Sequence, residues 1–222
     1  MSARDTILST IRNSLHVTSD DATRRAAVEA RLQSTPRGIV PQRGQGSLEQ
    51  QVATFISEAS RVQATITELT SSNDIPREIA RYLSANNLPA TLRMGSDERL
   101  AQLNWGLTQL TLSHGPSSGD DLNGLSHAEG AIAETGTLCL LSSASNPTTL
   151  NFLPDNHIVV LKRADLVGDL ESLWSRLRQR FGAGTWPRTV NLITGPSRSA
   201  DIEQQMLLGA HGPRRLHILI VP

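Results

Sequence analysis

Residues 193–203 combine the residue types that bind small anions. They read Ile-Thr-Gly-Pro-Ser-Arg-Ser-Ala-Asp-Ile-Glu and follow the apolar run Val190–Ile193. If a strand ends there and a helix begins near Ala200, backbone N–H groups at the helix start and the Arg198 guanidinium can hold a carboxylate or a phosphate. The segment predicts an anion site lined by Gly195, Pro196, Ser197, Arg198, Ser199 and Asp201.

Helix capping is the alternative interpretation of the same segment. Ser197 or Ser199 can cap the predicted helix, and the acidic residues Asp201 and Glu203 complement its dipole without any ligand. Both interpretations place a helix over residues 200–208.

The turn at 209–213, Gly-Ala-His-Gly-Pro, contains one residue that turn geometry does not require. Gly209 suits a left-handed helix cap, and Gly212 with Pro213 suits a turn. His211 can change charge near neutral pH and is a candidate acid, base or anion contact. A hydrogen-bonded structural histidine is the alternative.

A carboxylate beside a flexible glycine precedes the apolar run 138–141. Glu134 can act as a nucleophile, a general base or a partner for Arg198, with the adjoining Thr135, Gly136 and Thr137 lining the same site. The alternative is a buried glutamate that accepts backbone hydrogen bonds and shapes a bend.

Several other patterns are excluded. Residues 115–119 match the G-x-S-x-G nucleophile elbow, but no helical pattern follows them. Lys162, the only lysine, has no preceding glycine loop, so a Walker-type phosphate loop is absent. The histidines show no metal-binding spacing, and we predict no metal site.

The elements that position these residues alternate between helical and strand patterns. An apolar stripe at periods of three and four predicts a helix over 48–69, and Asp74 with Pro76 predicts the start of a second helix. Short apolar runs predict strands at 90–94, 107–112, 137–142, 157–161, 190–194 and 216–221, with helices at 97–103, 166–181 and 200–208. This alternation favours an α/β fold with a mostly parallel sheet flanked by helices. Ligand sites in such folds lie beyond the carboxyl ends of the strands.

Composition limits the function classes. Of the 222 residues, 38% are apolar and only 3% aromatic, and basic and acidic residues balance at a net charge of zero. Neither base stacking nor electrostatic attraction to nucleic acid is expected. The single cysteine, Cys139, excludes an iron–sulfur cluster held by this chain alone.

The first 46 residues form a separate region in this interpretation. Ile7, Leu8, Ile11 and Leu15 predict a short amphipathic helix that ends near His16, and the proline and glycine of residues 34–46 predict a mobile connector. The main domain is expected over 47–222. No apolar run is long enough for a membrane span, and the first residues lack the apolar core of a signal peptide, so a cytoplasmic location is expected.

Four ordered blocks resemble the LutC, or YkgG-like, lactate utilization family: residues 131–137, 153–157, 193–203 and 209–213. The resemblance spans about residues 47–222. It departs at Ser199, where threonine is expected, and at Ala210, where valine is commoner.

The resemblance implies a LUD domain with a fold similar to the NagB/RpiA/CoA-transferase group. It also implies a role in oxidising L-lactate to pyruvate beside partner proteins that carry iron–sulfur clusters. The motif positions carry over as site lining, with Glu134 and His211 as candidate catalytic groups. No cofactor is expected on this chain alone.

Two other functions remain open. An independent acyl or CoA transferase would use Glu134, since Glu134-Thr135-Gly136 loosely echoes the Glu-Asn-Gly element of such enzymes. A noncatalytic scaffold would use the motif loops to bind the iron–sulfur partners.

Overall fold

A computed structural model describes residues 2–18, 20–182, 184–202 and 205–222, without the side chains of 200–202 and 205–207. The chain divides into two compact units, residues 1–39 and 40–222, earlier than the predicted boundary after residue 46. The second unit includes the end of the predicted connector, where Gly44 is buried and the Gln45 side chain donates a hydrogen bond to Asp169.

The first unit consists of two helices, α1 (Ala3–Ser14) and α2 (Ala22–Ser34). Ser2 and Asp5 form a capping box at the start of α1, and Leu15 ends the helix, so the predicted amphipathic helix is confirmed. Helix α2 was not predicted. Asp21 caps it, and Thr35 ends it in a left-handed conformation just before Pro36.

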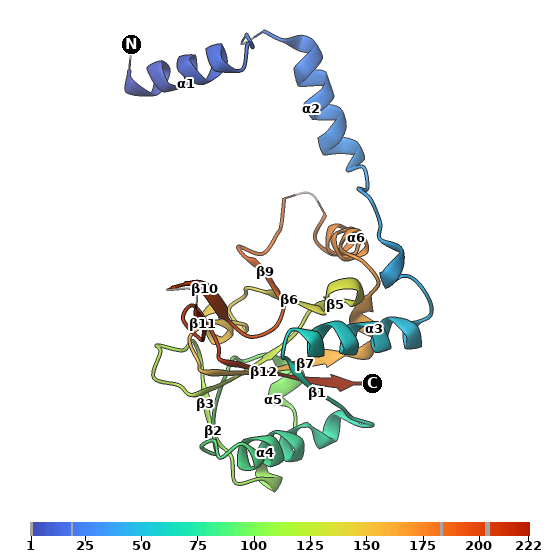
Figure 1. The fold of residues 1–222 in the computed structure, drawn as a ribbon, viewed down its shortest axis with the longest axis vertical. Coiled ribbons are helices and arrows are strands. Elements are labelled where there is room, and N and C mark those ends of the chain that lie inside the picture. The colour runs from blue at the N-terminus through green and yellow to red at the C-terminus, as the bar shows by residue number, and fades with distance from the viewer. Residues whose placement is uncertain (1, 19, 183, 203–204) are drawn as a thin grey trace. The chain divides into compact units, whose positions relative to one another are not determined.

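The second unit contains a six-stranded, all-parallel sheet in the order β1-β12-β7-β4-β2-β3 (Figure 1). The α/β class and the mostly parallel sheet are therefore confirmed. The strands are β1 (Thr65–Glu68), β12 (Arg215–Val221), β7 (Asn156–Lys162), β4 (Asn123–His127), β2 (Thr91–Met94) and β3 (Thr111–His114).

Alternation along the strands sends side chains to two separate cores. On β12, Leu216, Ile218 and Ile220 pack with α3 (Leu48–Arg61), whereas Leu219 and Val221 pack with α4 (Ile75–Ala85). Helices thus cover both faces of the sheet, as predicted. The short helix α5 (Glu98–Ala101) contributes Leu100 to the α4 side.

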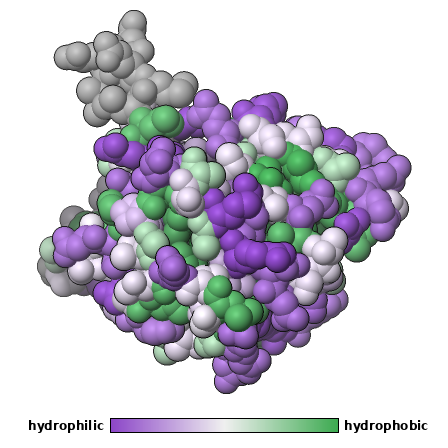
Figure 2. Space-filling view, turned by 90° about the horizontal axis from the view of Figure 1, so that it is seen from below, coloured by the Kyte–Doolittle hydropathy of each residue, from purple (hydrophilic) through white to green (hydrophobic). Residues whose placement is uncertain are grey.

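The apolar side of α4 is buried, and its other side is polar. Figure 2 shows mostly hydrophilic residues on the face seen from below, broken by small hydrophobic patches. Helix α4 lies at the bottom of the view in Figure 1. Its Arg77 and Arg81 form ion pairs with Asp74 and Glu78 on the outside of the helix.

A second, four-stranded sheet has the order β8-β5-β6-β9 and includes antiparallel pairs. Its strands are β8 (Leu166–Val167), β5 (Gly130–Ile132), β6 (Thr137–Leu141) and β9 (Val190–Ile193). Strands β6 and β9 were predicted as strands, but they do not belong to the parallel sheet. Helix α6 (Leu170–Phe181) packs on this second sheet through Leu173 and Leu177. Its predicted start at 166 was too early because Asp169 caps it.

The predicted helix over 48–69 is wrong beyond Arg61. The N–H of Val62 donates to Glu58 O, and Gln63 adopts a left-handed conformation with φ 70°, which ends α3. The β-branched residues of Thr65–Glu68 then pair with β12.

The predicted helix over 200–208 is also wrong where the structure describes this range, which excludes residues 203 and 204. The chain forms an antiparallel hairpin of β10 (Arg198–Ile202) and β11 (Gln205–Leu208). At its base, the Gly209 N–H donates to Ser197 O at 3.0 Å, and both Gly195 and Gly209 have positive φ. Pairing between strands overrides the local helical pattern here.

Candidate functional site

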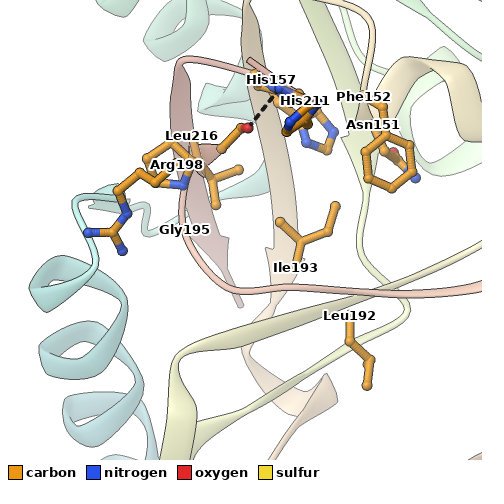
Figure 3. Close-up of a pocket in the computed structure, with 13 residues that line it drawn as sticks. Asn151, Phe152, His157, Leu192, Ile193, Gly195, Arg198, His211 and Leu216 are labelled. Carbon is orange, nitrogen blue, oxygen red and sulfur yellow. Dashed lines mark hydrogen bonds between the residues drawn. The ribbon is translucent and has the colours of Figure 1, made fainter. Parts of the chain in front are cut away.

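A cavity of about 260 Å³ lies where the motif segment that begins at Ile193 meets the turn at 209–213 (Figure 3). Its wall also includes the start of β7, the start of β12 and the loop before β7. The lining residues are Asn151, Phe152, His157, Leu192, Ile193, Gly195, Pro196, Ser197, Arg198, His211, Gly212, Pro213 and Leu216.

Ser197 holds the two motif segments together. Its N–H donates to Pro213 O at 2.8 Å, and its Oγ accepts a hydrogen bond from the His211 N–H at 3.3 Å. Gly212 passes so close to Ser197 that an added Cβ would lie 3.3 Å from the Ser197 Cβ. Segments that the sequence singled out separately therefore form one wall of the cavity.

A buried polar chain lies behind this wall. The Ser126 hydroxyl donates to Asn151 Oδ1 at 3.1 Å, and His157 Nε2 lies 3.1 Å from Ser126 Oγ. Since the Ser126 hydrogen goes to Asn151, its oxygen accepts the hydrogen of His157 Nε2. His157 Nδ1 then carries a lone pair, and it has no partner among the described residues.

His157 is only 1% exposed, and burial lowers its pKa to about 3. The ring is therefore neutral at physiological pH and can accept a hydrogen bond through Nδ1. A buried acceptor without a partner in a cavity wall is a candidate ligand contact.

Arg198 and His211 lie at the rim and are exposed. Figure 3 shows the Arg198 guanidinium pointing away from His157 and His211. The predicted cluster of helix-start amides is absent because the segment is a strand: Pro196 has no N–H, and the N–H of Ser197 bonds Pro213. Arg198 and Ser199 pair with Leu208 and Leu207 in the hairpin, and the Asp201 side chain lies outside the described residues.

Glu134 does not line the cavity. It is buried in the 3-10 helix Ala133–Thr135, and its Oε1 accepts a hydrogen bond from the Leu170 N–H at 3.1 Å, at the first residue of α6. Its backbone N–H donates to Gly168 O at 3.1 Å. These contacts match the alternative interpretation, in which a buried glutamate accepts backbone hydrogen bonds. The backbone group that it accepts from begins α6, so the carboxylate also stabilises the start of that helix.

The residues after Glu134 join neighbouring elements. The hydroxyls of Thr135 and Thr137 lie 2.7 Å apart, and the Thr137 hydroxyl is 2.7 Å from that of Thr194. Gly136 has φ 63°, and an added Cβ would lie 2.4 Å from the Ala59 N of α3. Like Glu134, these three residues do not line the cavity. The structure therefore does not bring Glu134 together with Arg198 and His211.

The cavity also lies at an unexpected place in the fold. His157 and Leu216 belong to the amino ends of β7 and β12, whereas Ile193 ends β9 of the second sheet. The cavity thus lies at the carboxyl end of β9, as expected for a ligand site, but at the amino ends of the strands β7 and β12 of the parallel sheet.

Asn151 was not predicted as a site residue, and His157 was included only as the last residue of the motif block 153–157. Both are buried polar residues that begin or precede the strand β7. For His157, that block and its position among apolar strand residues were the available signals.

The described residues contain neither a metal-binding cluster nor a membrane-spanning helix. No group of three or more histidine, cysteine, aspartate or glutamate side chains is arranged there to hold a metal ion. Within the same part of the chain, no helix has the length and apolar character needed to cross a membrane.

Comparison with known families matches the LUD domain to residues 89–221, more than half of the chain. The chain belongs to the LUD domain family. The matched region includes every residue that lines the cavity.

Individual relatives are identical to this chain at about a third of the aligned positions. It is 34% identical over 98 residues to lactate utilization protein C of Shouchella clausii, and 34% identical over 99 residues to that of Bacillus subtilis. It is 33% identical over 99 residues to the uncharacterized protein YkgG of Escherichia coli. These matches cover 44% of this chain and 41% to 43% of the relatives, so they span less than half of each relative.

A solved structure has a similar fold. A DUF162 family protein from Deinococcus radiodurans superposes with a TM-score of 0.60 at 21% identity, over 80% of this chain and 100% of that one.

Proposed function

We propose that this LUD domain protein is a component of an L-lactate utilization system and that the cavity binds the small carboxylate. The observation that carries the proposal is the convergence of both motif segments with His157 on one cavity. The names of the relatives support the lactate assignment.

The size and chemistry of the cavity suit a three-carbon hydroxy acid. A volume of about 260 Å³ is several times the roughly 30 Å³ that one water occupies in the liquid. Leu192, Ile193 and Leu216 offer apolar contacts for a methyl group. In this proposal, the lactate hydroxyl donates to His157 Nδ1, and its carboxylate lies toward the rim, where Arg198 turns inward to bind it.

Oxidation of L-lactate to pyruvate releases two electrons and two protons. Cys139, the only cysteine, is buried, and one thiolate cannot hold an iron–sulfur cluster. We therefore assign the electrons to iron–sulfur partner proteins. The contribution of this chain is to bind and orient the acid beside them.

Calorimetric titration with L-lactate and pyruvate tests this proposal. Arg198→Ala should weaken binding by about 1.5 to 3 kcal/mol, the range for charge-assisted hydrogen bonds. Arg77→Ala is the matched control, since that side chain is 81% exposed on α4 and does not line the cavity.

If Arg198→Ala binds L-lactate and pyruvate with unchanged affinity, Arg198 does not contact the bound acid. If the purified chain binds neither acid but still binds the iron–sulfur partners, the protein is the noncatalytic scaffold. The position of Glu134 against α6 gives no support to the transferase alternative.

A further inference from the structure

A second cavity adjoins the first and shares Pro196 and Leu216 with it. Its volume is about 480 Å³, and it lies at the amino ends of β1 and β12 and the last turns of α4. Its lining residues are Gln63, Thr65, Tyr82, Asn86, Asp155, Pro196, Leu208, Arg214, Arg215 and Leu216.

The lining residues include two guanidinium groups and a single carboxylate. Arg214 Nε lies 3.9 Å from Asp155 Oδ1, a long ion pair between exposed groups, and Arg215 Nη1 donates to Asn156 Oδ1 at 3.1 Å. A guanidinium has five N–H donors, so these contacts use few of them. The lining therefore carries net positive charge and unused donors.

The fold positions Arg214 for this role. Its side chain lies against Gly209, where an added Cβ would be 2.2 Å from Arg214 Cγ and 3.0 Å from Nε. Gly209 has φ 82° at the end of the hairpin. The absence of a side chain there lets the arginine cross the turn beside the shared residue Pro196.

Neutral polar groups complete the wall. The Thr65 hydroxyl lies 2.8 Å from His217 Nδ1, and the His217 ring stacks on Tyr82 with centroids 3.9 Å apart. Burial lowers the pKa of His217 to about 4, so the ring behind the wall is neutral. The side-chain amides of Gln63 and Asn86 line the same cavity.

We propose that this second cavity binds a phosphate group. Two guanidiniums can bind phosphate oxygens in a bidentate manner, and the side-chain amides of Gln63 and Asn86 supply further donors. The site is additional to the proposed lactate site, because lactate carries no phosphate. The shared residues Pro196 and Leu216 place the phosphate beside the first cavity, so it belongs either to free phosphate or to a phosphorylated small acid that spans both cavities.

Titration calorimetry with inorganic phosphate at constant ionic strength tests the site. Arg214→Gln/Arg215→Gln should weaken phosphate binding at least about tenfold, because each charge-assisted hydrogen bond is worth about one factor of ten or more. The control Arg77→Gln/Arg188→Gln removes the same charge from exposed arginines that line neither cavity and should leave binding unchanged. Thermal unfolding of each variant confirms that it is folded.

A second titration with 3-phosphoglycerate distinguishes the two sources of phosphate. If free phosphate is the ligand, phosphate and L-lactate bind together and phosphoglycerate binds no tighter than phosphate. If one molecule spans both cavities, phosphoglycerate binds tighter than either and excludes L-lactate. No saturable phosphate binding, or equal losses in both double variants, would overturn the proposal. The L-lactate titration of Arg214→Gln/Arg215→Gln separates the two proposals. If this variant still binds L-lactate, a failure of the phosphate site is not a failure of the lactate site.

Discussion

The Glu134 region and the Ser197 region look alike in sequence and differ in what they contact. Both place glycine, hydroxyl and charged residues next to apolar strands. Glu134 and Gly136 are packed against α6 and α3, whereas Ser197 joins two loops around a cavity. Ligand sites and tight packing both require small and polar residues, so residue types alone do not separate them.

Gly136→Ala should have the largest effect if the Glu134 region serves packing. The substitution adds strain at φ 63° and a clash with the backbone of α3, so the free energy of unfolding should fall by about 3 to 5 kcal/mol. Urea denaturation measures this. Gly115→Ala is the control, since φ is 108° but no atom lies within 4 Å of the added Cβ, and about 1 to 2 kcal/mol is expected. Equal losses at both positions would contradict the packing role.

Acid should destabilise the protein through the wall of the first cavity. His157 has a pKa of about 3 when folded and of about 6.5 when unfolded, so the unfolded chain binds the proton first. Its contribution to stability is complete above pH 6.5 and is lost as the pH falls toward 3, by about 1.4 kcal/mol per pH unit. Urea denaturation at pH 7, 6 and 5 should show a shallower loss in His157→Gln. An unchanged slope would mean that His157 is not buried as a neutral ring.

Glu134→Ala and His211→Ala should have smaller effects, and on different quantities. The first should lower stability, and the second should weaken L-lactate binding. Loss of the acceptor for Leu170 N–H should lower the free energy of unfolding by about 1 to 2 kcal/mol and leave L-lactate affinity unchanged. His211→Ala, at an exposed rim position, should change stability by less than about 0.5 kcal/mol and weaken L-lactate binding. Calorimetry and denaturation of both variants measure the pattern, and weaker L-lactate binding in Glu134→Ala would return the glutamate to the site.

Local patterns predicted the elements with strong local signals. Helix α4 begins at the predicted aspartate and proline, and the apolar runs of β7 and β12 form adjacent buried strands. Apolar spacing and turn residues act within a few positions, so the sequence alone was sufficient for them. The sequence was also sufficient to predict the α/β class and to identify the motif segments that line the cavity.

Pairing between distant segments decided the rest. Residues 198–202 and 205–208 form a hairpin, and Thr65–Glu68 forms a strand, because other strands and backbone groups satisfy their hydrogen bonds. Tertiary structure also separated His211 from Glu134 and brought His157 into the cavity wall. The sequence by itself determined which loops carry unusual polar residues. Only the fold decided which of them share a cavity, because that depends on contacts between residues far apart in the chain.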